Sequence, residues 1–490
     1  MGLAMKLTEN QSVLKQTAYY AAGLLVMKGS AFLILPITTG YLGTESFGSL
    51  DILLTWLSVG GILLGLGLTE AMYRFVGSSK TVERKAAVAG VAYRVQIMAC
   101  ILGFLLCFAL KDYAPEWLPG NITDTQWLLA SAVLVVTAAT ALPLAWLRLQ
   151  EQASLFFWLT SGKAAFQAAT TFVLLELGAG IDGVLLSGLF SSMFLVIALN
   201  RFVLPKIIVK PVLSTTQTAQ GFWLQSALEL LKYSTPIIAS GLLVFLTFGA
   251  EKWILAALTD TQSLALYAVA IQFAALVPLA LEPFAMWWFP KRFELLQQAN
   301  GRICNGNLAS LGCCFSFLSA LIFGWITPHV VQLWLPAEFH PAANLLPMLC
   351  FAMALKQCSH LLNTGCYTNT SPTIVFKLNA VTSILALGTF SIAIYLFSLP
   401  GLVYGFVAVY LGRTILFVRA SQKRLHLPYR YGTIFGSALL CALGLGFASR
   451  LDFSAALFSV GLTAGLTLAL IYKAGLLSVG PSPRMAVNPI

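Results

Sequence analysis

The sequence predicts an all-α, polytopic membrane protein with about 14 transmembrane helices. Of its 490 residues, 58% are hydrophobic and only 10% are charged, and the mean hydropathy is +0.84. Soluble proteins of ordinary composition carry about 25% charged residues. Because no long hydrophilic block separates the apolar runs, nearly the whole chain is expected to lie in a bilayer.

Apolar runs of about 20 residues, which is the length of a helix that crosses the hydrocarbon core, recur along the chain. Helical spans are expected at 18–37, 48–69, 86–110, 127–147, 155–176, 181–204, 233–257, 264–288, 308–333, 342–364, 373–396, 401–418, 432–449 and 454–473. The first run follows Lys6 and Lys15 and lacks a small-residue cleavage site after it, which predicts an uncleaved first helix. The fifth and sixth runs are separated by little more than GAGID (178–182), which predicts a tight hairpin.

Basic residues concentrate in alternate loops. The loops on the N-terminal side hold most of the Lys and Arg, and residues such as Arg201, Arg292 and Arg413 are assigned to them. The opposite loops hold only Lys111 and Arg450, together with most of the loop acids. By the positive-inside rule, both termini are expected in the cytoplasm. The net charge of +11 therefore reflects topology, and no nucleic-acid partner is expected.

Two similar segments predict an internal repeat. LKQTAYYAAGLLV (14–26) resembles LKYSTPIIASGLLV (231–244), and six spans lie between them. A repeat in the same orientation is typical of two six-helix lobes with a substrate path between them. The expected organisation is an N-terminal lobe at 1–204, a cytoplasmic linker at 205–232, a C-terminal lobe at 233–420, and two further helices with a cytoplasmic tail at 421–490.

Several basic residues remain inside the predicted spans. They are Lys28, Arg94, Lys163, Lys252 and Lys356. A charged side chain at the bilayer centre costs about 2.5–3.5 kcal/mol on insertion scales, so a water-filled lumen is the favoured location for these residues. Snorkelling to the membrane surface is the alternative for Arg94 and Lys252. Structural pairing or snorkelling is the alternative for the other three.

Polar residues at helical spacing accompany the intramembrane lysines and predict the faces that line this lumen. The predicted lumen-lining residues are Thr160, Gln167, Gln272, His360, Asn363 and Asn379. Glu251, Glu282 and His360 are candidate sites for a coupling proton or sodium ion, and a packing role is the alternative for His360. Asp51 is expected at the membrane interface.

Cationic side chains in a low-dielectric lumen favour a phosphate-bearing substrate. One such pair of charges 4 Å apart is worth about 4 kcal/mol at an effective dielectric constant of 20. The sequence has no phosphate-binding glycine loop, no HExxH, no Gly-x-Ser-x-Gly elbow and no large external loop. Its nine cysteines lack CxxC spacing and predict apolar packing, not metal binding. Transport of an anion, without cofactor or catalysis, is therefore the expected activity.

Two segments resemble those of a known family. GYLGTESFGSLDILLT (40–55) resembles the segment that follows the first helix of polysaccharide transporters in the multidrug/oligosaccharidyl-lipid/polysaccharide exporter superfamily. LALYAVAIQFAALVPLALEPFAMWWFPKRFE (264–294) resembles the eighth helix of that family. The resemblance implies two six-helix lobes arranged as a V, with the two additional helices at the C-terminus. Relatives have cationic residues in the central cavity, and the resemblance implies that Lys28 and Lys252 are the corresponding residues here.

The resemblance also implies a flippase. Its substrate would be an undecaprenyl-diphosphate-linked oligosaccharide for O-antigen, capsule or exopolysaccharide, moved from the cytoplasmic to the periplasmic leaflet of a bacterial inner membrane. Membrane lipids and the polysaccharide polymerase and chain-length machinery are the other expected partners. A peptidoglycan-type precursor is an alternative substrate. A cation-coupled multidrug exporter of the same superfamily and a membrane polymerase or glycosyltransferase are alternative functions.

Overall fold

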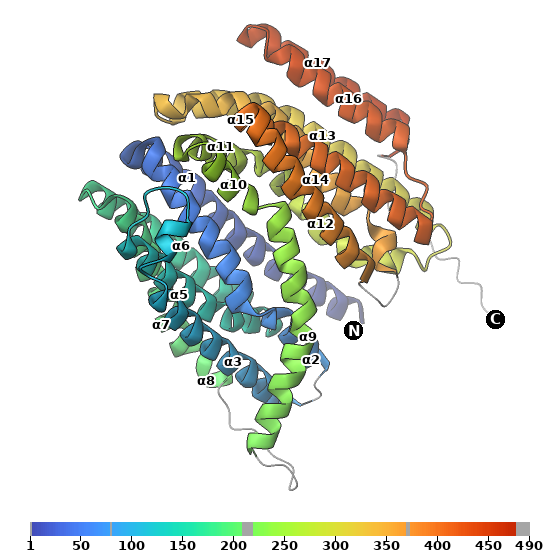
Figure 1. Cartoon of the computed structure of the whole chain (residues 1–490). Helices are drawn as coiled ribbons and strands as arrows, with labels where there is room; N and C mark the ends of the chain where they lie inside the picture. The colour runs from blue at the N-terminus through green and yellow to red at the C-terminus, as the bar shows by residue number, and fades with distance from the viewer. Residues whose placement is uncertain (1, 79–80, 208–218, 369–372, 477–490) are drawn as a thin grey trace, which may run out of the picture. The chain divides into compact units, whose positions relative to one another are not determined.

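The computed structural model describes residues 2–78, 81–207, 219–368 and 373–476 (Figure 1). Every regular element in these ranges is a helix, which confirms the predicted all-α fold. The chain divides into two compact units, Met1–Ala256 and Ala257–Ile490. The division falls within the seventh predicted span, so residues 219–256 pack with the preceding spans. The lobe limits drawn at 204 and 233 stay a prediction.

The first unit begins with two predicted spans in one helical element. Its helices are α1 (Gly2–Gly65), α2 (Leu68–Ser78), α3 (Val82–Ala109), α4 (Ala114–Trp117), α5 (Asp124–Leu149), α6 (Ala153–Glu176), α7 (Gly180–Phe202), α8 (Leu204–Ile207), α9 (Ala219–Thr247) and α10 (Ala250–Leu258). α1 is interrupted at Gly43, where φ is 66° and ψ is 179°. This conformation suits a residue without Cβ, and it separates the first span from the second.

Local sequence signals explain where helices of this unit begin. The Thr81 hydroxyl accepts a hydrogen bond from the Arg84 N–H at 3.3 Å and caps α3. Thr123 and Gln126 form a reciprocal capping box at the start of α5. Such caps satisfy the N–H groups that a first helical turn leaves unpaired.

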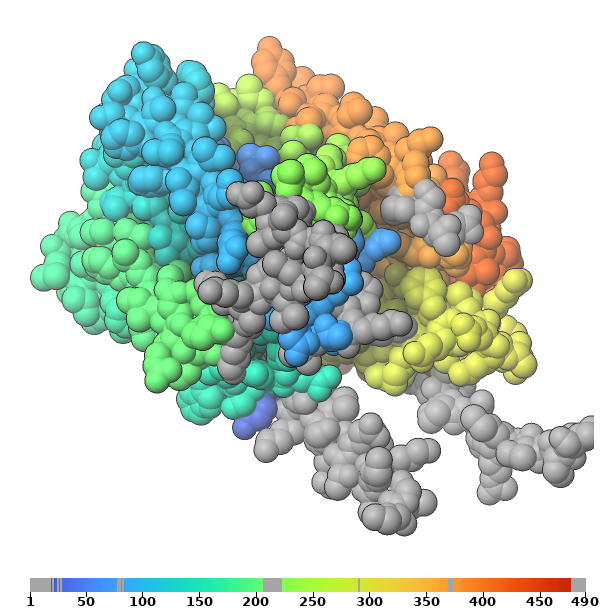
Figure 2. Space-filling model, turned by 90° about the horizontal axis from the view of Figure 1, so that it is seen from below, coloured from blue at the N-terminus to red at the C-terminus, as the bar shows by residue number. Residues whose placement is uncertain are grey.

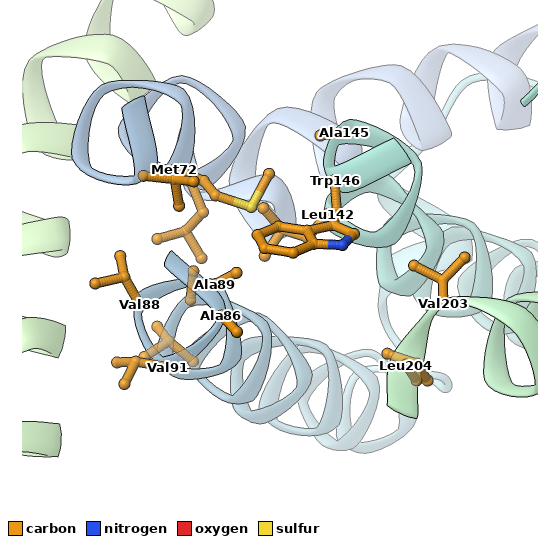
Figure 3. Close-up of a cluster of buried hydrophobic side chains, with 14 of the residues drawn as sticks. Met72, Ala86, Val88, Ala89, Val91, Leu142, Ala145, Trp146, Val203 and Leu204 are labelled. Atoms are coloured by element: carbon orange, nitrogen blue, oxygen red, sulfur yellow. The ribbon is translucent and has the colours of Figure 1, made fainter. Parts of the chain in front are cut away.

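The core of the first unit is built from large side chains that pack against small ones. Trp146 of α5 and Met72 of α2 face Ala86 and Ala89 of α3, as Figure 3 shows. Small residues let helix backbones approach closely, which is how helices associate where lipid removes the hydrophobic driving force. Figure 2 shows side chains of α3 (light blue) and of α7 and α8 (green) on one face of the first unit.

The second unit packs its helices around α13 and α14. Its elements are α11 (Thr261–Ala274), α12 (Leu276–Leu295), α13 (Gly301–Trp334), the 3₁₀ helix η1 (Ala337–Leu345), α14 (Leu346–Leu361), the 3₁₀ helix η2 (Thr364–Tyr367), α15 (Thr373–Arg424), α16 (Tyr431–Ala448) and α17 (Phe453–Lys473). α15 contains the eleventh and twelfth predicted spans, which meet at Ser398 with φ 53° and ψ −139°. Pro400 follows this break and cannot donate a backbone hydrogen bond.

The described helices accommodate every predicted span. Ten helical segments among the described residues are long and apolar enough to cross a membrane. Thr373–Arg424 holds two predicted runs, and Gly29–Val76 holds the second run and the last part of the first. α6 and α14 occupy the fifth and tenth runs, and α14 is shorter, at 16 residues, because η1 precedes it. The polytopic membrane fold predicted from composition is therefore confirmed.

A close backbone contact in the second unit generates a stability prediction. A Cβ atom added at Gly365 would lie 2.2 Å from the Ser421 carbonyl oxygen. We expect Gly365→Ala to lower the free energy of unfolding by about 1–3 kcal/mol, because the backbone must shift to relieve the overlap. Gly388→Ala is the control, since a Cβ there meets nothing within 4 Å. Thermal unfolding in detergent measures both variants, and equal melting temperatures would contradict the expectation.

Candidate functional site

A buried arginine lies within the second unit. Arg413 belongs to α15 and only 9% of its surface is exposed. Its Nη1 donates to Thr382 Oγ1 at 3.0 Å, and its Nη2 donates to Asn379 Oδ1 at 3.0 Å. The guanidinium also lies 4.5 Å from the ring centroid of Phe417. The assignment of Arg413 to a loop is wrong, because α15 continues to Arg424 and buries this position.

Arg413 joins the two halves of α15 through neutral groups. Asn379 and Thr382 lie before the break at Ser398, whereas Arg413 lies after it. Among the described residues, no carboxylate comes within ion-pair distance of the Arg413 guanidinium. Its hydrogen bonds therefore orient the side chain without cancelling its charge.

Two predicted site residues on α14 lie close to Arg413. Lys356 Nζ is 5.9 Å from the ring centroid of Tyr410, which is one helical turn from Arg413. Lys356 and His360 are four residues apart on α14, so they lie on the same face of the helix. The hydroxyl of Thr414 donates to the Leu355 carbonyl at 2.9 Å and fixes α15 against α14. Lys356, His360 and Arg413 form what we call the basic cluster.

A second arginine extends this positive region. Arg292 of α12 is half-buried, and its Nη1 donates to Asn363 Oδ1 at 3.2 Å. Its guanidinium carbon lies 5.0, 4.9 and 5.1 Å from the ring centroids of Phe289, Phe293 and Tyr367. Tyr367 belongs to η2, which packs against α15, the helix that carries Arg413, and so links Arg292 to the basic cluster. The assignment of Arg292 to a loop is also wrong, since it lies on a helix and packs among aromatic rings.

The basic cluster borders a small pocket. Arg413, Thr382 and Thr389 line a pocket of about 140 Å³ between the two halves of α15. Water in the liquid occupies about 30 Å³ per molecule, so this space suits a few waters or a single phosphate-sized group. It is too small for an oligosaccharide.

The first unit keeps the predicted polar stripe on α6, but most of its members bond within the protein. The Thr160 hydroxyl donates to the Phe156 carbonyl at 2.8 Å. Gln167 Oε1 accepts from Ser191 Oγ of α7 at 3.3 Å. Lys163 lies between Thr160 and Gln167 along α6 and is half-buried. Within the described part of the chain, no hydrogen bond or ion pair to Lys163 is found. Lys163 is thus the basic member of the stripe for which the described residues supply no partner.

Lys252 has a partner that the sequence analysis did not identify. Its Nζ lies 2.8 Å from Asp51 Oδ1, and the two side chains are 21% and 10% exposed. The neighbouring Glu251 is 1% exposed and accepts a hydrogen bond from the Gly249 N–H. Asp51 supplies the neutralising acid, so Lys252 presents no uncompensated charge in this conformation. Its role in substrate binding stays a prediction.

The remaining predicted site residues are dispersed. Arg94 and Glu282 are exposed, and Gln272 is half-buried on α11. The side chain of Lys28 lies outside those that the structure describes. Among the described residues, no group of His, Cys, Asp and Glu is arranged to hold a metal ion.

Comparisons with known proteins identify a family model and a membrane-protein relative. The sequence model of a family described as "Polysaccharide biosynthesis protein" matches residues 13–295. An uncharacterized membrane protein of Methanocaldococcus jannaschii is 27% identical over 232 residues, which cover 46% of this chain and 54% of the relative. The chain therefore spans about half the length of that curated relative.

Solved structures share the fold at low sequence identity. The lipid II flippase MurJ in an inward closed conformation has a TM-score of 0.62 and 10% identity, over 94% of this chain and 100% of that chain. An inward-facing multidrug resistance MATE family transporter of the MOP superfamily has a TM-score of 0.58 and 14% identity, over 84% and 94%. A Vibrio cholerae MATE transporter has a TM-score of 0.53 and 17% identity, over 85% and 96%. At these identities the similarity shows the fold alone.

The hydrogen bonds of Arg413 generate a prediction about stability. Asn379→Leu removes one acceptor and leaves a buried guanidinium N–H unpaired, which we expect to cost about 1–3 kcal/mol of unfolding free energy. Arg413→Met removes the charge as well as the donors. The loss of unfolding free energy in the double variant should then be smaller than the sum of the losses in the single variants, because either single substitution already removes the hydrogen bond between the two side chains. Additive losses in thermal or chemical unfolding would contradict the bonding described above.

Proposed function

The chain belongs to the polysaccharide biosynthesis protein family, and on that premise we propose that it flips an undecaprenyl-diphosphate-linked oligosaccharide across a membrane. The family match and the shared fold confirm the resemblance seen in residues 40–55 and 264–294. The proposed direction is from the cytoplasmic to the periplasmic leaflet of a bacterial inner membrane, with both chain termini in the cytoplasm. The product would supply O-antigen, capsule or exopolysaccharide assembly.

The observation that supports an anionic substrate is the pair of arginines in the second unit. Arg413 is almost fully buried and Arg292 is half-buried, and their hydrogen bonds go to the neutral side chains of Asn379, Thr382 and Asn363. Removing a charge from water without a counter-ion is costly, so such sites persist where function requires them. A diphosphate would supply the missing negative charge and would accept from the guanidinium groups.

The lysines predicted from sequence would extend this attraction along the substrate path. Lys356 belongs to the basic cluster, and Lys163 lies half-buried on α6. The polyprenyl tail stays in the lipid while the charged head group crosses by alternating access. A membrane potential with a negative interior assists outward movement of a dianion by about 4–5 kcal/mol per 100 mV. This contribution helps to release the head group from a strongly cationic site.

A coupling ion and protein partners complete the proposal. A counter-moving proton or sodium ion could use Glu251, Glu282 or His360. Glu251 is the most buried of these carboxylates, whereas Glu282 is exposed. The polysaccharide polymerase and chain-length machinery would act on the released product, and the chain itself would perform no catalytic step.

A multidrug exporter is the second candidate, because the fold is also that of MATE transporters. Organic cations favour a site with acidic side chains that retain their charge. Asp51 pairs with Lys252 in this structure, which reduces its attraction for a cation. The flippase proposal is therefore the better supported of the two.

Export assays with charge-neutral variants test the proposed function. We expect Lys28→Gln, Lys163→Gln, Lys356→Gln and Arg413→Gln to lower surface polysaccharide export, by about tenfold where about 1.4 kcal/mol of head-group binding is lost. The lysine-to-arginine and Arg413→Lys variants keep the charge and should retain more export. Lys111→Gln is the control, because this lysine lies in the turn after α3 and pairs with the adjacent Asp112.

Protein abundance in the membrane must be measured for every variant. A folded and abundant set of glutamine variants that all export at the normal level would overturn the electrostatic role of these residues.

A further inference from the structure

Within the first unit, the seventh predicted span runs along the second from one end to the other. Ser234 Oγ of α9 donates to the Gly67 carbonyl at 3.3 Å. Further along, a Cβ on Gly241 would lie 3.0 Å from Ile62 Cγ2. As residue numbers rise in one helix they fall in the other, so the two spans pack antiparallel.

The far end of this helix pair is held by a different kind of contact. Lys252 Nζ lies 2.8 Å from Asp51 Oδ1, and the Trp253 indole donates to the Ile52 carbonyl at 3.4 Å. The other ion pair in the described residues joins the sequence neighbours Lys111 and Asp112. Of the two ion pairs found among the described residues, the one between Asp51 and Lys252 therefore connects separate spans.

Backbone breaks interrupt both spans, one near each end of the pair. The chain turns at Leu66 and Gly67, with φ of 48° and 59°, between α1 and α2. It turns again at Gly249, with φ of 159°, between α9 and α10. Lys252 therefore lies on α10, a nine-residue helix (Ala250–Leu258) that the break separates from α9. Positions that absorb large backbone changes at the ends of elements are typical hinges.

The ion pair is incompletely satisfied. Asp51 Oδ2 is buried and has no hydrogen-bond partner among the described residues, so Lys252 compensates only one of the two carboxylate oxygens. A pair of this kind is stable while water is excluded, because each charge needs the other. Once water reaches it, hydration replaces the attraction and the two charges separate at little cost.

We propose that Asp51 and Lys252 form an ionic latch, which closes this end of the helix pair and opens during the transport cycle. The proposal rests on the proposed function, and the charge pattern of the loops predicts that the latch lies at the outer side of the membrane. Both residues lie in the first compact unit, so opening the latch would release α10, the end of the seventh span, from the second span. Opening would also free Lys252 for a phosphate.

Thiol labelling in intact cells tests the latch without any substrate. Ile52 is 0% exposed and lies beside Asp51, so Ile52→Cys places a reporter thiol behind the latch. A membrane-impermeant maleimide should label this reporter slowly while the latch is closed. Adding Asp51→Asn or Lys252→Gln should raise the labelling rate by about tenfold, as expected if closure loses about 1.4 kcal/mol. The charge exchange Asp51→Lys with Lys252→Asp should restore slow labelling, and the chain without Ile52→Cys gives the background.

Unchanged labelling in both neutralised variants would overturn the latch. Faster labelling that the charge exchange does not reverse would also overturn it, because loss of packing alone would then explain the change. Faster and reversible labelling in a protein that moves no lipid-linked oligosaccharide would support the latch and reject the proposed function.

A reversible cross-link tests whether the latch must open. Asp51→Cys with Lys252→Cys, joined by a short reducible bis-thiosulfonate, should lose export, and reduction should restore it. Each single cysteine variant treated with the same reagent is the control. A protease site inserted between α8 and α9 reports the cross-link as two fragments that stay joined until they are reduced. Normal export by the fully cross-linked protein would contradict the proposal.

Discussion

Lipid offers no hydrogen bonds, and this constraint determines both the fold and the treatment of its charges. Backbone groups inside a bilayer must bond within their own segment, which explains why every regular element in the described ranges is helical. Charged side chains inside the bilayer also need polar partners, and neighbouring helices must supply them. The chain meets it in two ways, by an ion pair at Lys252 and by neutral hydrogen bonds at Arg413.

These two arrangements have different electrostatic consequences. A carboxylate at 2.8 Å cancels most of the field of Lys252, so a ligand must displace Asp51 before it gains from that lysine. Asn379 and Thr382 hold Arg413 in place but leave its positive charge intact. An approaching anion therefore gains from Arg413 without separating an existing ion pair. The basic cluster is preorganised for anions, whereas Lys252 becomes available only after a conformational change.

The positions of the spans could be predicted from the sequence because length and hydropathy determine them almost alone. The contacts of individual charges could not. Asp51 and Lys252 are 201 residues apart, and nothing local in either segment indicates the pairing. Arg413 was assigned to a loop because it precedes Arg419, Lys423 and Arg424 in a basic region that fits the positive-inside rule. A better signal was available, since the buried rings of Phe406, Tyr410 and Phe417 share its helical face.

The positions of the helix breaks differ for the ion-paired lysine and for the arginine with neutral partners. The lysine with a carboxylate partner lies on α10, which Gly249 separates from α9, whereas Arg413, on the second half of α15, donates two hydrogen bonds to the first half. A charge whose partner must change is best carried by a segment that can move, because the exchange requires both separation and hydration. A charge that must keep its orientation is best fixed by several bonds to rigid helices. The distribution of neutral and ionic partners thus agrees with the proposed carrier, in which a fixed site binds the head group and a closure opens.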